Sequence, residues 1–440
     1  MLSRKPGGRG ASTSICHIAP SDRDRSRVLI ASHSHPSITK GGAEIAAYQI
    51  FSALSDHPAY QAWFLGCVRD DWHQKLGATF SQPFSGREYL YAAGAFDWFK
   101  FANLDPKFPD AFRALLLHLK PQVVHFHHFL NLGVESFLHV RKTLPACKIV
   151  LTLHEYLAIC HHYGQMITKR NRTLCYQASP ERCGVCFTDI GPSDFFLRTR
   201  YIKRFFDLVD IFIAPSRFLR ERYIAWGIPA DRLTVMENLI PQTKPVPEQI
   251  DRPNERDIMR VGFFGQISPL KGINVLFEAA AILAERENDI IVFEIYGDDA
   301  GQPAEFQADF REKLGGAGRN VKFQGAYEQC QVDALMQAVD LILVPSIWWE
   351  NSPVVIQEAQ RNRRPVVCSD IGGMAEKVNP GIDGFHFPVG NSIALAALLT
   401  RLAQAPECLR EITTKMGALV PAKQTSESYN AFYTALIDAK

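Results

Sequence analysis

Short apolar runs alternate with longer helical stretches along most of the chain, and this alternation limits the fold more than any other feature. From Arg27 the runs are RVLIAS, AWFLGCV, VVHFHHF, KIVLTLHE and DIFIAPS. Continuous apolar runs separated by helical stretches are typical of parallel strands with crossover helices. The sequence therefore predicts a doubly wound α/β domain over residues 27–240.

The same alternation starts again after a polar segment. Residues 241–257, PQTKPVPEQIDRPNERD, are rich in Pro and charge and have no apolar period, so we expect an interdomain linker there. The runs MRVGFFGQI, IIVFEIYGD, VKFQGAY, DLILVPSI and PVVCSD then predict a second domain of the same class over residues 258–424. At 440 residues the chain is long enough for both domains. Residues 425–440 are expected to form a C-terminal helix.

The N-terminal residues, the hydropathy and the net charge of the chain give no sign of membrane insertion or of general nucleic-acid binding. Residues 1–26 combine Gly, Ser and charge without periodicity, so we predict a disordered tail, with a targeting peptide as the alternative. No signal peptide is evident, and no apolar run approaches the ~20 residues that span a bilayer, which favours a cytoplasmic protein. The net charge of +2 gives no general reason to expect nucleic-acid binding. Any phosphate site must therefore be local.

Loops at the ends of predicted strands can hold phosphate, because doubly wound domains bind ligands at the carboxyl ends of their strands. Gly41 and Gly42 open the first helix, where free amides and the helix dipole favour an anion; a plain turn is the alternative. Gly265 ends the first strand of the second half, and Lys271 opens the next helix with a charge that can neutralise a diphosphate. The spacing fits neither the dinucleotide fingerprint nor the P-loop.

The strongest local signal is DLILVPSIWWENSPVVIQEAQ, where an apolar strand runs into a turn and a helix. Glu350 lies just outside this helix and Glu358 lies about two turns in, so both reach one cleft. Two carboxylates placed in this way suit sugar hydroxyls, whereas a solvated helix face is the alternative for Glu358. The residues expected to cap and open the helix and to line the ligand are Asn351, Ser352, Pro353 and Val354.

Taken together, these residues resemble the retaining family-four glycosyltransferases, whose GT-B fold consists of two Rossmann-like domains facing a central cleft. The resemblance covers nearly the whole chain from Arg27 onward. Its most specific element is the E-x7-E motif from Glu350 to Glu358. Supporting elements are Gly41-Gly42, the histidine of LTLHEY, which is His154, and G-x5-K-G starting at Gly265.

The resemblance implies transfer of a sugar from a nucleoside-diphosphate sugar to a hydroxyl acceptor, with retention of configuration, in polysaccharide or glycolipid assembly. Residues 27–240 would be the acceptor domain and residues 258–424 the donor domain, with the C-terminal helix returning to the first. Catalysis in this family requires no metal or cofactor. The departing phosphate would help deprotonate the acceptor hydroxyl. A sugar-nucleotide epimerase, a phosphorylase and a non-catalytic nucleotide-sugar binding protein are the alternatives, because fold alone does not fix function.

The same resemblance implies a role for each site residue. Glu358 would hold the ribose hydroxyls, and Glu350 with the amides after it would hold the transferred sugar and the diphosphate. Lys271 would take the diphosphate charge, and His154 would lie beside the transferred sugar. The two glycines, Gly41 and Gly42, would close on the diphosphate from the other domain. Gln266 stands where the family has an arginine, so one positive charge is missing.

An insertion over residues 156–192 follows the predicted strand that ends at Glu155. It contains four of the ten cysteines, enough for a tetrahedral zinc site: Cys160, Cys175, Cys183 and Cys186. Their spacing is looser than in a zinc finger and His161 and His162 compete as ligands, so spare thiols of a reducing compartment are the alternative.

Three further patterns leave two interpretations each. In HFHHF, His125 and His127 share one face of a strand, as core or cleft-lining residues rather than ligands. Residues 193–210 interleave aromatic residues with basic ones, which indicates either a membrane-surface helix or a packed helix with a solvated basic side. Trp348 and Trp349 are either core residues or sugar-stacking residues.

Overall fold

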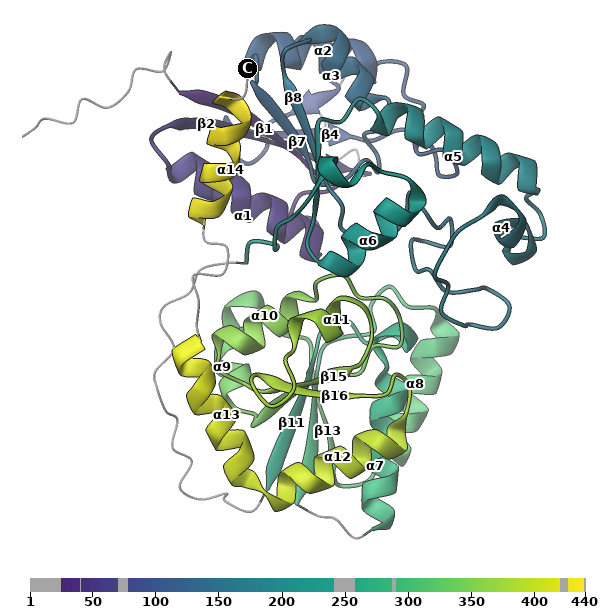
Figure 1. Cartoon of the computed structure of the whole chain (residues 1–440), viewed down its shortest axis with the longest axis vertical. Coiled ribbons are helices and arrows are strands. Elements are labelled where there is room, and N and C mark those ends of the chain that lie inside the picture. The colour runs from purple at the N-terminus through teal and green to yellow at the C-terminus, as the bar shows by residue number, and fades with distance from the viewer. Residues whose placement is uncertain are drawn as a thin grey trace, which may run out of the picture.

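The computed structural model describes residues 25–39, 41–69, 78–240, 258–286, 290–419 and 426–438. Nearly all of the predicted tail, residues 1–24, and the whole predicted linker, residues 241–257, lie outside the described residues. The remaining chain forms two α/β domains, one above the other in Figure 1.

The first domain is built on one sheet in which every neighbouring pair is parallel except β3 with β4. In spatial order its strands are β10 (Leu233–Val235), β9 (Ile211–Ala214), β8 (Lys148–Thr152), β7 (Val123–Phe126), β1 (Ser26–Ala31), β2 (Tyr60–Val68), β4 (Glu88–Ala92) and β3 (Phe80–Ser81). Val28 pairs with Ala62 on one side and Val123 on the other. Strand β1 is fully buried from Val28 to Ala31, because helices cover both faces of the sheet.

Helices of the first domain fill the crossovers between these strands. They are α1 (Gly42–Asp56), α2 (Phe108–Leu119), α3 (Ser136–Thr143), α4 (Pro180–Cys186), α5 (Pro192–Phe206) and α6 (Arg217–Trp226). A short antiparallel pair, β5 (Phe96–Asp97) and β6 (Ala102–Asn103), precedes α2. In α1, Ala46, Ile50 and Leu54 recur every four residues and are buried, so the sequence period decides which face meets the sheet.

The second domain has a sheet in which all neighbouring strands are parallel. Its order is β13 (Val321–Gly325), β12 (Ile291–Tyr296), β11 (Met259–Phe264), β14 (Leu341–Val344), β15 (Val366–Ser369) and β16 (Gly384–Phe387). Its helices are α7 (Ile273–Glu285), α8 (Ala304–Gly316), α9 (Val332–Gln337), α10 (Val354–Arg361), α11 (Gly372–Lys377), α12 (Ser392–Gln404) and α13 (Pro406–Leu419). One core lies under α7 and α12 and another under α9 and α10. The predicted fold class, two tandem Rossmann-like doubly wound domains, is therefore confirmed.

The last helix, α14 (Ser426–Asp438), lies on the first domain although it follows the second in sequence (Figure 1). Tyr429, Tyr433 and Leu436 join the core beneath α1, and the Tyr60 hydroxyl donates to the Asn430 carbonyl oxygen at 2.9 Å. The chain thus crosses between the domains twice.

Several side chains of the second domain contact the first directly. The Glu376 carboxylate at the end of α11 accepts hydrogen bonds from the Arg217 and Phe218 amides, at 2.8 and 2.9 Å, and so caps the N-terminus of α6. Trp349 stacks on Phe218 with ring centroids 4.9 Å apart and donates to the Cys175 carbonyl oxygen at 3.1 Å. Trp349 is 4% exposed, so the structure makes it an interdomain packing residue rather than a sugar-stacking one.

Helix α5 differs from both interpretations of residues 193–210 at one position. Arg198 is buried, not solvated, and donates to the carbonyl oxygens of Phe99, Leu157 and Ala158 at 2.6 to 2.8 Å. Its guanidinium also lies over the Phe101 ring at 5.1 Å. These partners satisfy the buried charge and fix the chain that follows β8. In the described part of the chain, no helix has the length and apolar character to cross a membrane.

Candidate active site between the two domains

Glu350 lies after β14 with its carboxylate held by three donors. Its Oε1 accepts from Lys271 Nζ at 2.6 Å, from Ser346 Oγ at 2.9 Å and from Trp348 Nε1 at 2.9 Å, and its side chain is 8% exposed. Lys271 ends the short 3-10 helix η3 (Pro269–Lys271), 79 residues earlier in the chain. The buried carboxylate is thus matched by one positive charge that is itself one-third exposed.

A glycine makes this pairing feasible. Gly272 has φ +75°, and a Cβ there would lie 1.9 Å from the Pro345 carbonyl oxygen. Only a residue without a side chain allows η3 to approach the end of β14 this closely. The first glycine of the predicted loop, Gly265, has φ +124° and donates its amide to the Tyr296 carbonyl oxygen at 3.1 Å. Gln266 is exposed and donates its side-chain amide to the Ala300 carbonyl oxygen at 3.4 Å.

Glu358 lies inside α10, which begins at Val354 with Pro353 at the N-cap position. Its carboxylate is buried and accepts a hydrogen bond from Gln329 Nε2 at 2.7 Å. Burial raises the pKa of Glu358, and the Gln329 hydrogen bond opposes this rise. A buried acceptor with one neutral donor has room for further hydrogen bonds from a ligand.

The start of α10 meets the start of α1 across the domain boundary. Gly42 is the first residue of α1 and Gly41 its N-cap, and a Cβ on Gly42 would lie 3.6 Å from Val354 Cγ2. Two helix N-termini, each with free amides and the positive end of a dipole, therefore lie side by side. An anion between the domains would meet both.

Beneath Gly41 the first domain carries a buried carboxylate. A Cβ on Gly41 would lie 2.4 Å from Glu44 Oε2, and Glu44 Oε1 lies 3.1 Å from His33 Nε2. Burial alone would raise the pKa of Glu44, but the hydrogen bond and charge of His33 outweigh it, so the pKa is lowered. The hydrogen bond from His33 offsets part of the cost of burying this carboxylate near a predicted diphosphate site.

Histidines from three strand ends gather beside this pair. His154, after β8, lies with Nε2 3.0 Å from His127 Nδ1, and His128 Nε2 lies 3.2 Å from Glu155 Oε1. The His33 and His128 rings are 4.4 Å apart. Burial, with the neighbouring histidines, lowers the pKa of His154 to about 3, and burial raises the pKa of Glu155 to about 8. At neutral pH His154 is therefore neutral and Glu155 is mostly protonated.

The loop that carries Asn351 and Ser352 is tied to the first domain. Asn351 Nδ2 donates to the His154 carbonyl oxygen, and Ser352 Oγ donates to Glu237 Oε1 at 2.7 Å. Glu237 also accepts from Gln357 at 2.7 Å and forms an ion pair with Lys377. The structure thus places Asn351, Ser352 and the start of α10 against the first domain, directly after the Glu350–Lys271 pair, whereas the contacts of Gly265, Gln266 and Glu358 lie within the second domain.

Sequence reasoning missed several members of this boundary: His33, Glu44, Glu237, Gln329 and Glu376. His33 and Gln329 follow strands β1 and β13, so the rule that ligands bind at strand ends pointed to their loops. No comparable signal marked Glu237 or Glu376, whose partners lie more than 100 residues away.

The predicted zinc site is not assembled. In the described ranges no three His, Cys, Asp or Glu side chains are grouped as metal ligands. The thiols have other partners instead: Cys175 Sγ donates to the Gln177 carbonyl oxygen at 3.5 Å, and Cys186 Sγ accepts from the Lys169 amide at 3.3 Å. Cys160 packs at the edge of the first-domain core, and Cys183 is partly buried in α4. In this part of the chain the four thiols are therefore not grouped as zinc ligands.

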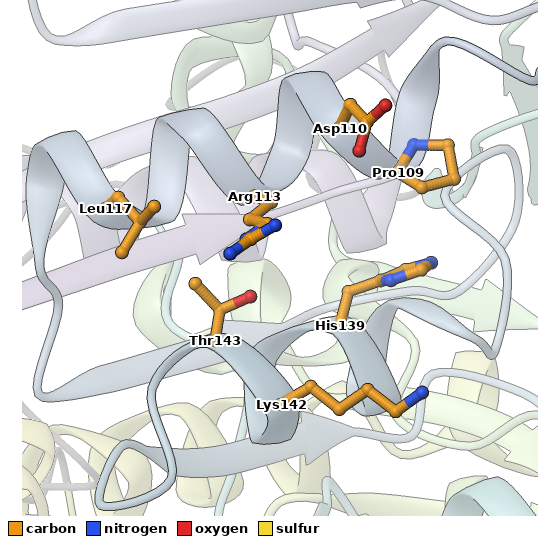
Figure 2. Close-up of a pocket in the computed structure, with 7 residues that line it drawn as sticks. All are labelled: Pro109, Asp110, Arg113, Leu117, His139, Lys142 and Thr143. Atoms are coloured by element: carbon orange, nitrogen blue, oxygen red, sulfur yellow. The ribbon is translucent and has the colours of Figure 1, made fainter.

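A hollow of ≈ 450 Å³ lies elsewhere, between α2 and α3 (Figure 2). It is lined by Pro109, Asp110, Arg113, Leu117, His139, Lys142 and Thr143. The residues predicted for donor binding and catalysis do not line it, so it is separate from the interdomain site.

Comparisons with known proteins agree with this geometry. The family described as Glycosyltransferase Family 4 matches residues 41–243, and the family described as Glycosyl transferases group 1 matches residues 248–417. Amylovoran biosynthesis glycosyltransferase AmsK of Erwinia amylovora is 29% identical over 46% of this chain and 49% of its own length. Lipopolysaccharide 1,2-N-acetylglucosaminetransferase of Salmonella typhimurium is 26% identical over 49% of this chain and 58% of its own. The chain thus spans less than two thirds of either relative.

Solved structures share the whole fold. Anabaena HepE in complex with UDP-glucose has a TM-score of 0.63 and 17% identity, covering 94% of this chain and 100% of HepE. Sucrose-phosphate synthase of Thermosynechococcus elongatus has a TM-score of 0.69 and 17% identity over the same shares. At this identity the likeness shows the fold, which is the GT-B fold of glycosyltransferases.

Proposed function

We propose that this protein, a GT-B chain whose two halves both match glycosyltransferase families, transfers a sugar from a nucleoside-diphosphate sugar to a hydroxyl acceptor with retention of configuration. The observation that carries the proposal is the meeting of the α1 and α10 N-termini, with the buried Glu358 inside α10 and Lys271 paired with Glu350 four residues before α10 begins. This arrangement offers charge for a diphosphate and a carboxylate for ribose hydroxyls within one boundary.

Each group has a step in the proposed reaction. Glu358 accepts hydrogen bonds from the ribose hydroxyls, in addition to the one from Gln329. Lys271 turns from Glu350 toward the diphosphate, whose leaving charge the two helix N-termini also stabilise. Glu350 and the backbone amides that follow it hold the transferred sugar. No metal is needed for this step in the proposal, because these groups supply the positive potential, and Gln266 adds none.

The acceptor hydroxyl attacks the anomeric carbon from the face that the diphosphate leaves. The bond from that carbon to the diphosphate oxygen breaks, the bond to the acceptor oxygen forms, and the acceptor proton passes to the departing phosphate. Neither Glu350 nor His154 forms a covalent intermediate in this account. A glycosyl adduct trapped on either side chain would overturn it.

A uridine diphosphate sugar is the first donor to test, since HepE was solved with UDP-glucose. The two curated relatives named above support a polysaccharide or glycolipid acceptor. We also propose a reducing, cytoplasmic location, because the nine described cysteines are all free thiols.

Contact with a membrane that carries such an acceptor would use α5. Phe196 and Leu197 are 54% and 59% exposed and lie on the same helix as the exposed Arg200 and Arg204. Sedimentation with anionic vesicles should fall for Phe196→Ser combined with Leu197→Ser. Equal sedimentation of the variant and the native protein would remove the membrane contact from the proposal.

The experiment for the function is a panel of nucleoside-diphosphate sugars with pooled glycan and lipid-linked acceptors. We expect nucleoside-diphosphate release with one donor, and NMR of the first product should show the anomeric configuration of that donor. An inverted product would refute retention. Donor hydrolysis or epimerisation without transfer would favour the epimerase or phosphorylase alternative, and tight binding without turnover would make the protein a binding module.

A further inference from the structure

A buried and a partly buried histidine share a hydrogen bond at the edge of the proposed sugar site. His127 follows β7 and is 1% exposed, and its Nδ1 lies 3.0 Å from Nε2 of His154. Burial is the main reason that the pKa of each ring is far below its ordinary value. Both rings are therefore neutral at pH 7, and each carries one hydrogen. One ring donates and the other accepts, so their tautomers must be opposite.

The second ring nitrogen of His127 shows which of the two rings donates the hydrogen bond. His127 Nε2 is buried and has no hydrogen-bond partner among the described residues. With its hydrogen on Nε2, His127 would bury an unpaired N–H donor. With its hydrogen on Nδ1, only a lone pair stays unused. Buried orphan N–H groups are rarer than under-used acceptors, so His127 Nδ1–H donates to His154 Nε2.

This direction fixes the state of His154. Its Nε2 accepts, so its own hydrogen is on Nδ1, a nitrogen that makes no hydrogen bond within the described ranges. We propose that His127 is a positioning residue that holds His154 in the Nδ1–H form, so that His154 offers an N–H donor to an oxygen of the bound sugar. The inference rests on the proposed function, which places the transferred sugar beside His154.

The layer beneath His127 keeps the pair in place. The His125 ring lies 4.3 Å from the His127 ring, and both His125 nitrogens are occupied, by Tyr433 Oη at 2.5 Å and by Thr152 Oγ1 at 2.7 Å. Tyr433 belongs to α14, the helix that returns from the second domain. His125, itself held by Tyr433 and Thr152, therefore fixes the position of His127, and His127 in turn orients His154.

The test compares His127→Asn with His127→Leu. Asn and Leu are similar in size, but only Asn keeps an N–H donor for His154 Nε2. The readouts are the ring-nitrogen NMR spectrum of 15N-histidine-labelled protein, with His154→Gln to assign the His154 signals, and kcat with the donor found above. Exposed His118→Leu on α2 is the control for loss of a histidine.

We expect the Nδ1–H form of His154 in the native protein and in His127→Asn, and its loss in His127→Leu. The kcat of His127→Leu should fall about tenfold, as for one neutral hydrogen bond, with unchanged affinity for the nucleoside diphosphate. An Nε2–H form in the native protein, or an unchanged spectrum and kcat in folded His127→Leu, would overturn the inference. Absence of turnover in the native protein refutes the proposed function instead, while the spectrum still tests the tautomer.

Discussion

Replacing Lys271 with methionine should destabilise the second domain by an amount that its contacts predict. The substitution keeps the apolar stem and removes the charge that lies 2.6 Å from Glu350 Oε1. Glu350 would then be a buried carboxylate without a counter-charge. It would keep its hydrogen bonds from Ser346 and Trp348, both at 2.9 Å.

The magnitude follows from burial. Removing one partner of a fully buried ion pair costs ~3–5 kcal/mol because the other charge is left uncompensated. Lys271 is 34% exposed, so solvent already screens part of the attraction, and the two neutral donors remain. We therefore expect a loss of about 1–3 kcal/mol in the free energy of unfolding.

The assay is urea unfolding of a double-mutant cycle. Glu350→Gln in the Lys271→Met background removes the unpaired charge, so the double variant should be more stable than Lys271→Met alone. Lys313→Met is the control, since its pair with Asp309 is exposed and should contribute at most about 0.5 kcal/mol. The reasoning fails if Lys271→Met is as stable as the native protein, or if the second substitution destabilises it further.

Three more results follow from the structure. Folding raises the pKa of Glu155 from 4.5 to about 8, so its contribution to stability is complete below pH 4.5 and is lost as the pH rises to about 8. Between pH 5 and 8 the free energy of unfolding of the native protein should therefore fall with pH, by at most ~1.4 kcal/mol per pH unit. Urea unfolding of Glu155→Gln should show no such fall. Ser216 caps the Leu219 amide of α6, so Glu376→Ala removes only the interdomain hydrogen bonds to the Arg217 and Phe218 amides and should lower the free energy of unfolding by about 1 kcal/mol; no change by chemical denaturation would argue against this interdomain cap. Purified protein should lack stoichiometric zinc, and the double variant Cys183→Ser, Cys186→Ser should have the same melting temperature as the native protein. One bound zinc per chain would contradict the thiol arrangement.

Much of the fold could be predicted because its information is local. Each predicted strand run overlaps an observed strand, and the helix expected near Pro353 begins at Val354. The run VVHFHHF shows the limit of this reasoning: β7 ends at Phe126, because His127 and His128 leave the strand to join the polar group at its end. Periodicity finds the strand, whereas the partners of its last residues depend on the neighbouring strands.

The rest of the site depends on contacts between distant parts of the chain. The pairing of Lys271 with Glu350 needs the close approach that Gly272 allows. From the sequence Arg198 is expected to be a solvated charge, but its three carbonyl partners come from two distant segments, Leu157 and Ala158 after β8 and Phe99 between β5 and β6. Glu237 gains its role only when the second domain brings Ser352 and Lys377 to it. A local sequence pattern does not show which residues far apart in the chain come into contact.

A thermal-shift titration tests most directly whether the boundary between the domains binds a nucleoside diphosphate through Glu358. Native protein, Glu358→Gln and the exposed control Glu312→Gln would each be titrated with UDP and with the other nucleoside diphosphates. We expect one nucleotide at 100 times its Kd to stabilise the native protein and Glu312→Gln by about 2.7 kcal/mol, and Glu358→Gln by clearly less. Equal stabilisation of all three proteins, or of none by any nucleotide, would contradict the account.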